Sequence, residues 1–402
     1  MNKLKKCFCK YIFKYGKKEN KMQFIDLKAQ YAKLKDKIDA NIQNVISNAD
    51  FISGPEVKEI EEKLAEYVGR KYCVTCANGT DALTLAMRVF DVKPGDAVFV
   101  PTFTFYSTSE VVSLEGATPI FVDVNERTFN MDSKKLEKAI ERVIQEGKLN
   151  PKAIIPVDLF GQVANFPEIL KIAEKYNLKV VEDGAQGFGG EINGKKACSF
   201  GDISTTSFFP AKPLGCYGDG GAIFTDDETM YQLMLSLRVH GKGSFKYENV
   251  RVGYNSRLDT IQAAILLPKL EAFQEYELDA RNKFAKIYTE RLKDIVKTPV
   301  VPEGYVSSWA QYTLIMESKE ERNFVQTKLK EAGIPTMIYY PIPLHKQVVY
   351  EGYDFNVEEL KVAENLCNCV LSLPMHPYLD ESIVNTVVEA IKNAVEEYRR
   401  IK

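Results

Sequence analysis

Short apolar runs alternate with amphipathic segments along most of the chain, beginning near residue 24. The apolar runs predict seven strands, over residues 72–76, 97–100, 119–124, 153–157, 178–181, 203–209 and 222–225. Apolar residues at helical spacing predict helices that open at Gly54-Pro55 and that cover residues 80–90, 107–114, 133–146 and 167–176. This alternation predicts an α/β fold, in which helices cover both faces of a mostly parallel seven-stranded sheet.

The pattern changes twice after residue 200. A short glycine-rich loop separates the last two predicted strands, which indicates one antiparallel strand in the sheet. Apolar residues at helical spacing predict mostly helix over residues 258–292, with a kink at Pro268. Beyond about residue 296 we expect a small α+β domain with strands 311–316, 336–339 and 370–373 and helices 322–332, 357–366 and 381–399. The predicted parts are a disordered basic leader (1–22), a large domain with an N-terminal segment (23–270), and a bridging helix with a small C-terminal domain (271–402).

Composition argues against several classes of protein. The 402 residues carry a formal net charge of only -2, and no apolar run approaches the about 18 residues of a membrane span. We therefore expect neither nucleic-acid binding nor stable membrane insertion. Eight cysteines and three histidines are scattered, so we expect reduced thiols and no metal site. The first 21 residues hold eight lysines against one acid, Glu19. A membrane-surface tail and a true start at Met22 are the alternatives to a disordered leader.

One lysine has an unusual setting. Lys212 lies in the loop between the last two predicted strands, which contains four glycines: Gly215, Gly218, Gly220 and Gly221. Glycine allows backbone conformations that other residues avoid, so such a loop can hold a side chain in place. A held, partly desolvated amine is suited to forming an imine with a carbonyl compound. A simple turn whose lysine points into water is an equally good interpretation of this stretch alone.

Other candidate residues lie at the carboxyl ends of predicted strands, where parallel sheets bind ligands, and one, Arg257, precedes a predicted helix. Asp183 ends a buried strand and needs a cationic partner, either a pyridinium nitrogen or a salt bridge, or else a role as a helix cap. Gly79 and Thr80 open a helix, which suits a phosphate or ordinary capping. Phe105 suits stacking on a flat cofactor or packing in the core. Arg257 suits clamping an anion or lying in solvent at a helix start.

Together these residues resemble the fold-type I, pyridoxal-phosphate-dependent sugar aminotransferases of the DegT/DnrJ/EryC1/StrS family. The resemblance runs from about Phe24 to the C-terminus. The segments that carry it are ANGTDAL (77–83), EDGAQ (182–186), SFFPAKPLG (207–215), GDGG (218–221), YNSRLD (254–259) and YPIPLH (340–345). So many matches in the same order make the resemblance specific.

The resemblance implies a role for each matched residue. Lys212 would hold pyridoxal 5'-phosphate as an imine and shuttle the proton, while Asp183 would keep the pyridine nitrogen protonated. Further contacts to the cofactor are implied for Gly79, Thr80, Phe105, Gln186, Ser207 and, from the neighbouring subunit of a homodimer with shared active sites, Asn255. Substrate contacts are implied for Arg257, Tyr339, Tyr340 and His345.

Within the family, the chain looks most like a subgroup that aminates UDP-2-acetamido-2-deoxy-3-oxo-glucuronate with L-glutamate. The implied setting is surface polysaccharide or glycan synthesis in the bacterial cytoplasm. In that subgroup a histidine often stands before the tyrosine that matches Tyr340, whereas this chain has Tyr339. If that histidine holds the sugar carboxylate, the change bears on whether the sugar is a uronic acid.

The alternatives are an aminotransferase for a 4-keto-6-deoxy or other 3-keto nucleotide sugar, and a catalytically idle cofactor-binding regulator. A dehydratase branch with histidine at the lysine position is disfavoured by Lys212. A dehydrogenase is disfavoured because no G-x-G-x-x-G follows the first strand.

Overall fold

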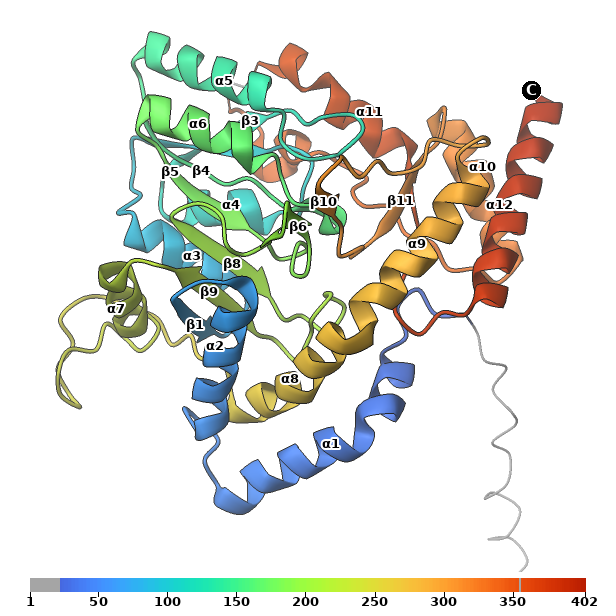
Figure 1. The fold of residues 1–402 in the computed structure, drawn as a ribbon. Coiled ribbons are helices and arrows are strands. Elements are labelled where there is room, and N and C mark those ends of the chain that lie inside the picture. Colours follow the sequence, from blue (N-terminus) through green and yellow to red (C-terminus); the bar gives the residue numbers. More distant parts are fainter. Residues whose placement is uncertain (1–21, 354–355) are drawn as a thin grey trace, which may run out of the picture.

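The computed structural model describes residues 22–353 and 356–402, and its centre is a seven-stranded sheet in the order β1-β9-β8-β5-β4-β2-β3 (Figure 1). The strands are β1 (Tyr72–Cys76), β2 (Asp96–Pro101), β3 (Thr118–Val122), β4 (Asn150–Ile154), β5 (Lys179–Asp183), β8 (Ile203–Ser207) and β9 (Gly221–Thr225). Within this sheet only β9 is antiparallel to its neighbours, β1 and β8. The predicted α/β fold, with its seven mostly parallel strands and one antiparallel strand, is confirmed.

Successive residues of a strand point to opposite faces, and each face carries its own helices. Val98 and Val100 of β2 pack into the core beneath α3 (Gly79–Val89), α4 (Ser107–Leu114) and α7 (Glu228–Leu237). Ala97 and Phe99 face the other way, toward α5 (Ser133–Glu146) and α6 (Phe166–Tyr176). On that side β9 is covered by α2 (Pro55–Val68) and α8 (Thr260–Ala272).

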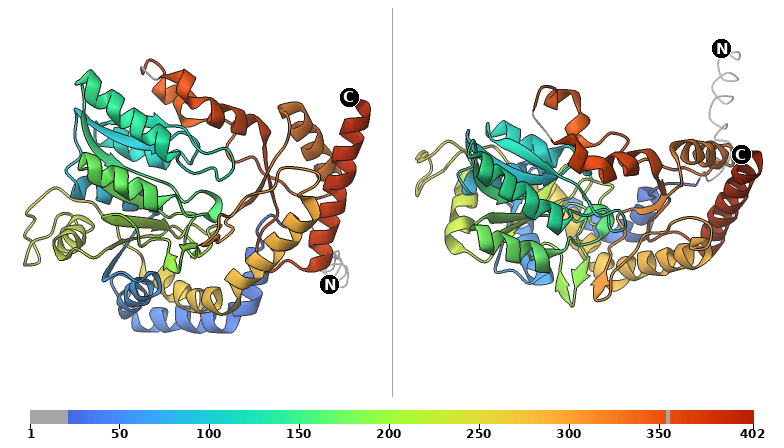
Figure 2. Two further views of the ribbon diagram at one scale, coloured as in Figure 1. Left: turned by 45° about the horizontal axis from the view of Figure 1, so that its top comes forward. Right: turned by 90° about the horizontal axis from the view of Figure 1, so that it is seen from above.

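A second core lies in the C-terminal third of the chain. It is built between α9 (Leu278–Leu292), α10 (Lys319–Glu331), α12 (Glu381–Ile401) and the antiparallel pair β11 (Tyr312–Ile315) and β12 (Val370–Leu373). Figure 2 shows α9 and α12 side by side, away from the large sheet. The remaining helices and strands are α1 (Leu27–Asn48), α11 (Lys361–Cys369), β6 (Glu191–Ile192), β7 (Lys195–Lys196) and β10 (Tyr305–Val306).

Two expectations about local structure need correction. The strand predicted at 336–339 does not form, and only Met337 pairs, with Ser372 of β12. Prolines at 335, 341 and 343 flank this segment and have no N–H to donate, so the ladder does not extend. The fourth strand lies at 150–154 rather than 153–157. Pro268 lies inside α8, which is followed by a π-helical turn at Phe273–Glu277, and the kink at Pro268 stays a prediction.

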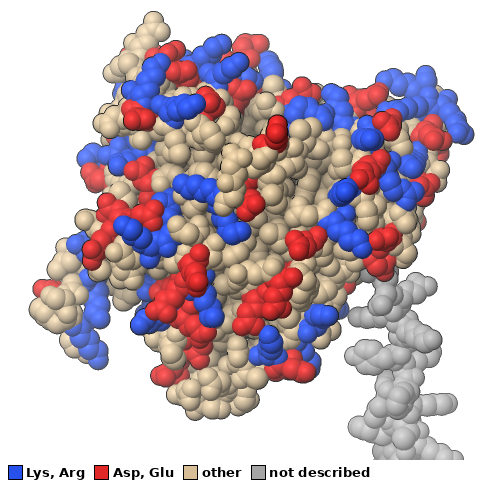
Figure 3. All heavy atoms as spheres, viewed as in Figure 1, with Lys and Arg blue, Asp and Glu red and all other residues tan. Residues whose placement is uncertain are grey.

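Lys and Arg are interspersed with Asp and Glu over the face shown in Figure 3, as the small net charge leads us to expect. Among the helices described, none is both long and apolar enough to cross a bilayer. The basic leader lies outside the described residues, apart from Met22. The division into domains at residue 270 stays a prediction.

Candidate active site

The loop that carries Lys212 connects β8 to β9, two central strands of the large sheet. Its ends are closed by backbone hydrogen bonds from Phe208 N–H to the Gly220 carbonyl and from Cys216 N–H to the Phe208 carbonyl, both at 2.8 Å. A Cβ atom at Gly215 would lie 2.6 Å from the Phe209 carbonyl oxygen, so only glycine fits there. The loop is thus held at both ends, as a fixed amine requires.

Asp183 ends β5, next to β8, and is 5% exposed. Its Oδ2 accepts a hydrogen bond from Thr108 Oγ1 at 2.9 Å, and its Oδ1 accepts one from Ala185 N–H at 3.2 Å. Burial raises the pKa of Asp183, while Thr108, Ala185 and the positive charge of Lys212 lower it in part. Burial also lowers the pKa of Lys212, and the charge of Asp183 opposes that shift. The two groups therefore lie within each other's electrostatic field, with Asp183 buried and Lys212 partly buried.

The start of α3 approaches the end of β8. Asn78 caps the helix, because its Oδ1 accepts from Asp81 N–H at 2.8 Å. A Cβ atom at Gly79 would lie 2.7 Å from Ser207 Cβ, so this close approach needs glycine. Thr80 Oγ1 lies 2.8 Å from Ser107 Oγ. The free amides of a first helical turn favour an anion, and hydroxyl groups surround this one.

Aromatic rings gather beside the carboxyl end of β2. Phe105 is 55% exposed, and its ring centroid lies 6.4 Å from that of Tyr340. Phe103 is buried in the core, 6.2 Å from the same tyrosine ring. Gln186 Nε2 donates to the Tyr340 hydroxyl at 3.2 Å, and its Oε1 accepts from Phe160 N–H at 3.0 Å. Phe105 is thus the ring with a free face, and Gln186 joins the large sheet to the C-terminal segment.

His345 is buried, and both nitrogens of its ring are held by other residues. Its Nδ1 lies 2.7 Å from Thr102 Oγ1, and its Nε2 lies 3.2 Å from Glu364 Oε1. A carboxylate only accepts, so Nε2 carries the hydrogen and Nδ1 accepts from Thr102. Leu344 N–H also donates to the Thr102 carbonyl at 2.8 Å. Both ring nitrogens are therefore occupied: Nδ1 joins the C-terminal segment to the end of β2, and Nε2 binds Glu364 of α11 (Lys361–Cys369).

The remaining predicted residues lie at the edges of the site. Tyr339 is half-buried, with its ring 6.2 Å from that of Phe24. Asn255 is exposed and forms an isolated bridge with Val239, after α7. Arg257 is partly buried. The structure thus brings Lys212, Asp183 and the turn of Gly79 and Thr80 together, while the roles of all the site residues stay predictions.

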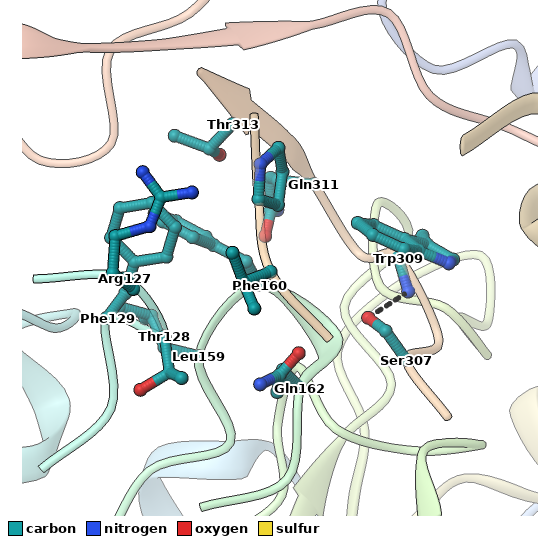
Figure 4. A pocket seen from close by; sticks show the side chains of 12 residues that line it. Arg127, Thr128, Phe129, Leu159, Phe160, Gln162, Ser307, Trp309, Gln311 and Thr313 are labelled. Carbon is teal, nitrogen blue, oxygen red and sulfur yellow. Dashed lines mark hydrogen bonds between the residues drawn. The ribbon is translucent and has the colours of Figure 1, made fainter. Parts of the chain in front are cut away.

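A small, partly open cavity of about 20 Å³ lies behind this site and is large enough for about one water molecule (Figure 4). Its lining includes Arg127, Phe129, Phe160, Trp309 and Gln311. None of the predicted site residues lines it. Phe160 separates it from the site, because its backbone N–H binds Gln186 while its side chain faces the cavity.

Two residues of this site were missed by the sequence analysis. Thr108 holds Asp183, and Ser107 contacts Thr80, both from the first turn of α4. The signal was present, since Ser107 and Thr108 directly follow the segment 101–106 at a predicted strand end. Because Ser and Thr are common at helix starts as caps, their position alone does not indicate a contact with Asp183 or Thr80.

The family model of the DegT/DnrJ/EryC1/StrS aminotransferases matches residues 32–392. The chain belongs to this family. It is 48% identical over 373 residues to UDP-2-acetamido-2-deoxy-3-oxo-D-glucuronate aminotransferase of Pseudomonas aeruginosa, covering 92% of this chain and 100% of that protein. It is 40% identical to UDP-N-acetyl-3-dehydro-alpha-D-glucosamine 3-aminotransferase of Acidithiobacillus ferrooxidans, covering 92% and 97%. A DegT DnrJ EryC1 StrS aminotransferase from Brucella abortus has a TM-score of 0.90 at 49% identity, covering 92% of this chain and 99% of that one.

The aminotransferases of this family depend on pyridoxal phosphate. A family structure from Bacillus subtilis, NtdA, was solved with its cofactor PMP bound, with a TM-score of 0.82, 30% identity and coverage of 93% and 83%. The residues of this chain fit such a cofactor. Asp183 is a buried carboxylate with two neutral donors, so a cationic ring nitrogen would complete its surroundings. Lys212 has a lowered pKa, which favours the neutral amine that reacts with an aldehyde.

Proposed function

We propose that this aminotransferase moves an amino group from L-glutamate to the keto group of a UDP-linked sugar, with UDP-2-acetamido-2-deoxy-3-oxo-glucuronate as the expected acceptor. The observation that carries the proposal is that Lys212 lies within the electrostatic field of the buried Asp183 carboxylate, beside the turn of Gly79 and Thr80. The choice of sugar is supported by the likeness to the Pseudomonas aeruginosa enzyme over its whole length. An aminotransferase for another 3-keto or a 4-keto-6-deoxy nucleotide sugar is the alternative.

Pyridoxal phosphate supplies the electron sink that lets an amino group pass from one carbon skeleton to another. The chain supplies position and proton transfer. The Lys212 amine has a pKa lowered by burial, so it can take a proton from a substrate carbon and return it. Because the loop holds this amine, the transfer is effectively intramolecular, which is worth orders of magnitude in rate. Thr108 and Ala185 hold the Asp183 carboxylate in place, and this carboxylate would pair with the ring nitrogen of the cofactor.

We also propose a homodimer with shared active sites. The segment after α7 extends from the body of the protein (Figure 1) and carries four exposed apolar side chains: Phe245, Tyr247, Val250 and Val252. Asn255 follows this segment and is exposed in the single chain. Contact with a second copy would cover the apolar side chains and bring Asn255 to the partner's phosphate turn. A cytoplasmic location is proposed because the six cysteines in the described residues are buried and unpaired.

The test uses the purified holoenzyme with L-glutamate and each of three acceptors: the 3-oxo-glucuronate, its 3-oxo-glucose counterpart, and a 4-keto-6-deoxy sugar. We expect 2-oxoglutarate and a new amino sugar with the first acceptor, and neither product with Lys212→Ala. Preference for the 3-oxo-glucose compound would move the assignment to a neutral 3-keto sugar, consistent with Tyr339. Absence of 2-oxoglutarate with every acceptor would refute the proposal.

A further inference from the structure

Three carboxyl groups lie buried at one end of the large sheet. Asp158 follows β4, and Glu182 and Asp183 are the last two residues of β5. Asp158 and Glu182 are 0% exposed and Asp183 is 5% exposed. Since successive strand residues point to opposite faces, Asp183 points toward Thr108 while Glu182 points to the other side of the sheet. Three buried carboxyl groups this close together repel one another when all are ionised, so one of them is expected to be protonated.

Glu182 is surrounded as an ionised carboxylate would be. Its Oε1 accepts from Cys198 N–H and its Oε2 from Phe200 N–H, both at 2.7 Å. The guanidinium of Arg70 adds positive charge nearby, held by the carbonyl oxygens of Phe200 and Gly201 at 2.8 Å. Burial raises the pKa of Glu182, while Asp158, the two short backbone donors and Arg70 lower it in part and so favour a negative charge on this residue.

Asp158 is surrounded differently. Its Oδ1 accepts from Ala164 N–H at 2.8 Å, but its Oδ2 has no donor among the described residues. The Asp158 and Glu182 side chains are within hydrogen-bonding reach of each other. A carboxylate is only an acceptor, so a hydrogen bond between two carboxyl groups requires a proton on one of them. The oxygen that lacks any other partner is the Oδ2 of Asp158.

We propose that Asp158 is protonated on Oδ2 and donates to Glu182, and that this neutral acid is a positioning residue for the cofactor site. The pair then carries one negative charge, next to Arg70, and Asp158 adds none beside Asp183. The other titratable groups that face Asp158 are Cys198 and Tyr305, and neither supplies a cation. Burial and the charge of Glu182 raise the pKa of Asp158 well above its ordinary value, in agreement with the contacts.

The residues around Asp158 show what it positions. Its backbone N–H donates to the Asp183 carbonyl at 3.0 Å, and the loop that it begins supplies the Phe160 N–H bond to Gln186. Its side chain packs so closely on Gly187 that a Cβ there would lie 2.4 Å from Asp158 Cβ. An ionised Asp158 without a cation would have to leave this place, and the loops after β4 and β5 would separate. The proposal does not depend on which sugar the enzyme aminates.

The first test is infrared spectroscopy of the holoenzyme in D₂O at neutral pH, comparing protein made with ordinary aspartate and with aspartate carrying carbon-13 in its side-chain carboxyl. We expect the carbonyl band of a protonated, buried carboxylic acid to shift with the label and to be absent from Asp158→Asn. The matched control is Asp123→Asn, since Asp123 is equally buried but paired with Lys135, so its loss should leave the band. No such band in the wild type, or its survival in Asp158→Asn, would overturn the assignment.

The second test measures whether the proton on Asp158 affects binding of the cofactor. Asparagine can still donate to Glu182 and cannot ionise, whereas alanine can do neither. We therefore expect Asp158→Ala to bind pyridoxal phosphate about tenfold more weakly than the wild type and Asp158→Asn to restore the affinity. The raised pKa of Asp158 also means that wild-type stability falls as pH rises above about 3.9, the ordinary value of an aspartate. Asp158→Asn should show a weaker dependence, and what remains comes from Asp183 and Glu182. Equal cofactor affinity for the alanine variant and the wild type would refute the positioning role, even if the band is found.

Discussion

Replacing Thr108 with valine tests the electrostatics of the site most directly. The change keeps the shape of the side chain and removes the hydroxyl that donates to Asp183 Oδ2 at 2.9 Å, between residues that are 1% and 5% exposed. A hydrogen bond to a buried charged group contributes about 1.5–3 kcal/mol. Ala185 N–H, at 3.2 Å, is the other donor and stays in place.

The loss should appear in cofactor affinity. Without cofactor, Asp183 can escape the penalty by taking up a proton, because its pKa is already raised by burial. With cofactor bound, it must be ionised to pair with the ring nitrogen. A loss of about 2 kcal/mol on binding weakens affinity about 30-fold. Thr108 lowers the pKa of Asp183, so its removal raises that pKa further, and the defect should be largest at acidic pH.

The assay is titration of the apoprotein with pyridoxal phosphate, followed by equilibrium dialysis across a pH series. Thr104→Val is the matched control, since Thr104 is equally buried and lies on the same segment, but contacts Thr108 only at 3.5 Å and not Asp183. If Thr108→Val binds the cofactor as tightly as Thr104→Val at every pH, the hydroxyl does not hold Asp183 in its charged form.

Three further predictions concern separate parts of the chain. Borohydride treatment of the holoenzyme should attach the cofactor to Lys212 and to no other residue, as peptide mass mapping would show; an unmodified Lys212 would contradict its role. His345→Ala should lower the free energy of unfolding by about 2 kcal/mol through loss of its contacts to Thr102 and Glu364, and urea titration would measure this; wild-type stability would show that these contacts contribute little. Burial lowers the pKa of His376 to about 4, so its contribution to stability is present above pH ~6.5, the unfolded value, and is lost as pH falls toward 4. Thermal unfolding of His376→Asn should therefore depend less on acidic pH than that of the wild type, and parallel curves would exclude this residue as the cause.

Much of the site could be predicted because its residues lie in segments with strong local signals. Asp183 ends a buried strand and Lys212 lies in a glycine-rich loop, and both positions follow from strand order. The partners of these residues were harder to foresee. Thr108 reaches Asp183 only because α4 packs back across the sheet, and nothing in the local sequence distinguishes it from a capping residue.

Other features depended on contacts between distant segments. His345 lies in a matched motif, so a substrate contact was expected, yet its ring is held by Thr102, 243 residues earlier in the chain. The segment 336–339 has side chains suited to a strand. It forms no ladder because the flanking prolines have no backbone N–H to donate. Burial, the state of protonation and long-range pairing are set by the whole fold and leave little trace in a single segment.

The placing of the lysine loop between two central strands also affects how the molecule fluctuates. β8 is flanked by β5 and β9, and β9 by β8 and β1, so opening this hairpin means breaking ladders on both sides. Amide hydrogens there should exchange only through the rarest, most global openings, whereas the stretch around Tyr339, which has no ladder, can exchange through small local ones. The groups that we propose for the chemistry thus belong to the slowest-opening unit of the chain, and the residues around Tyr339 can change without loosening that unit.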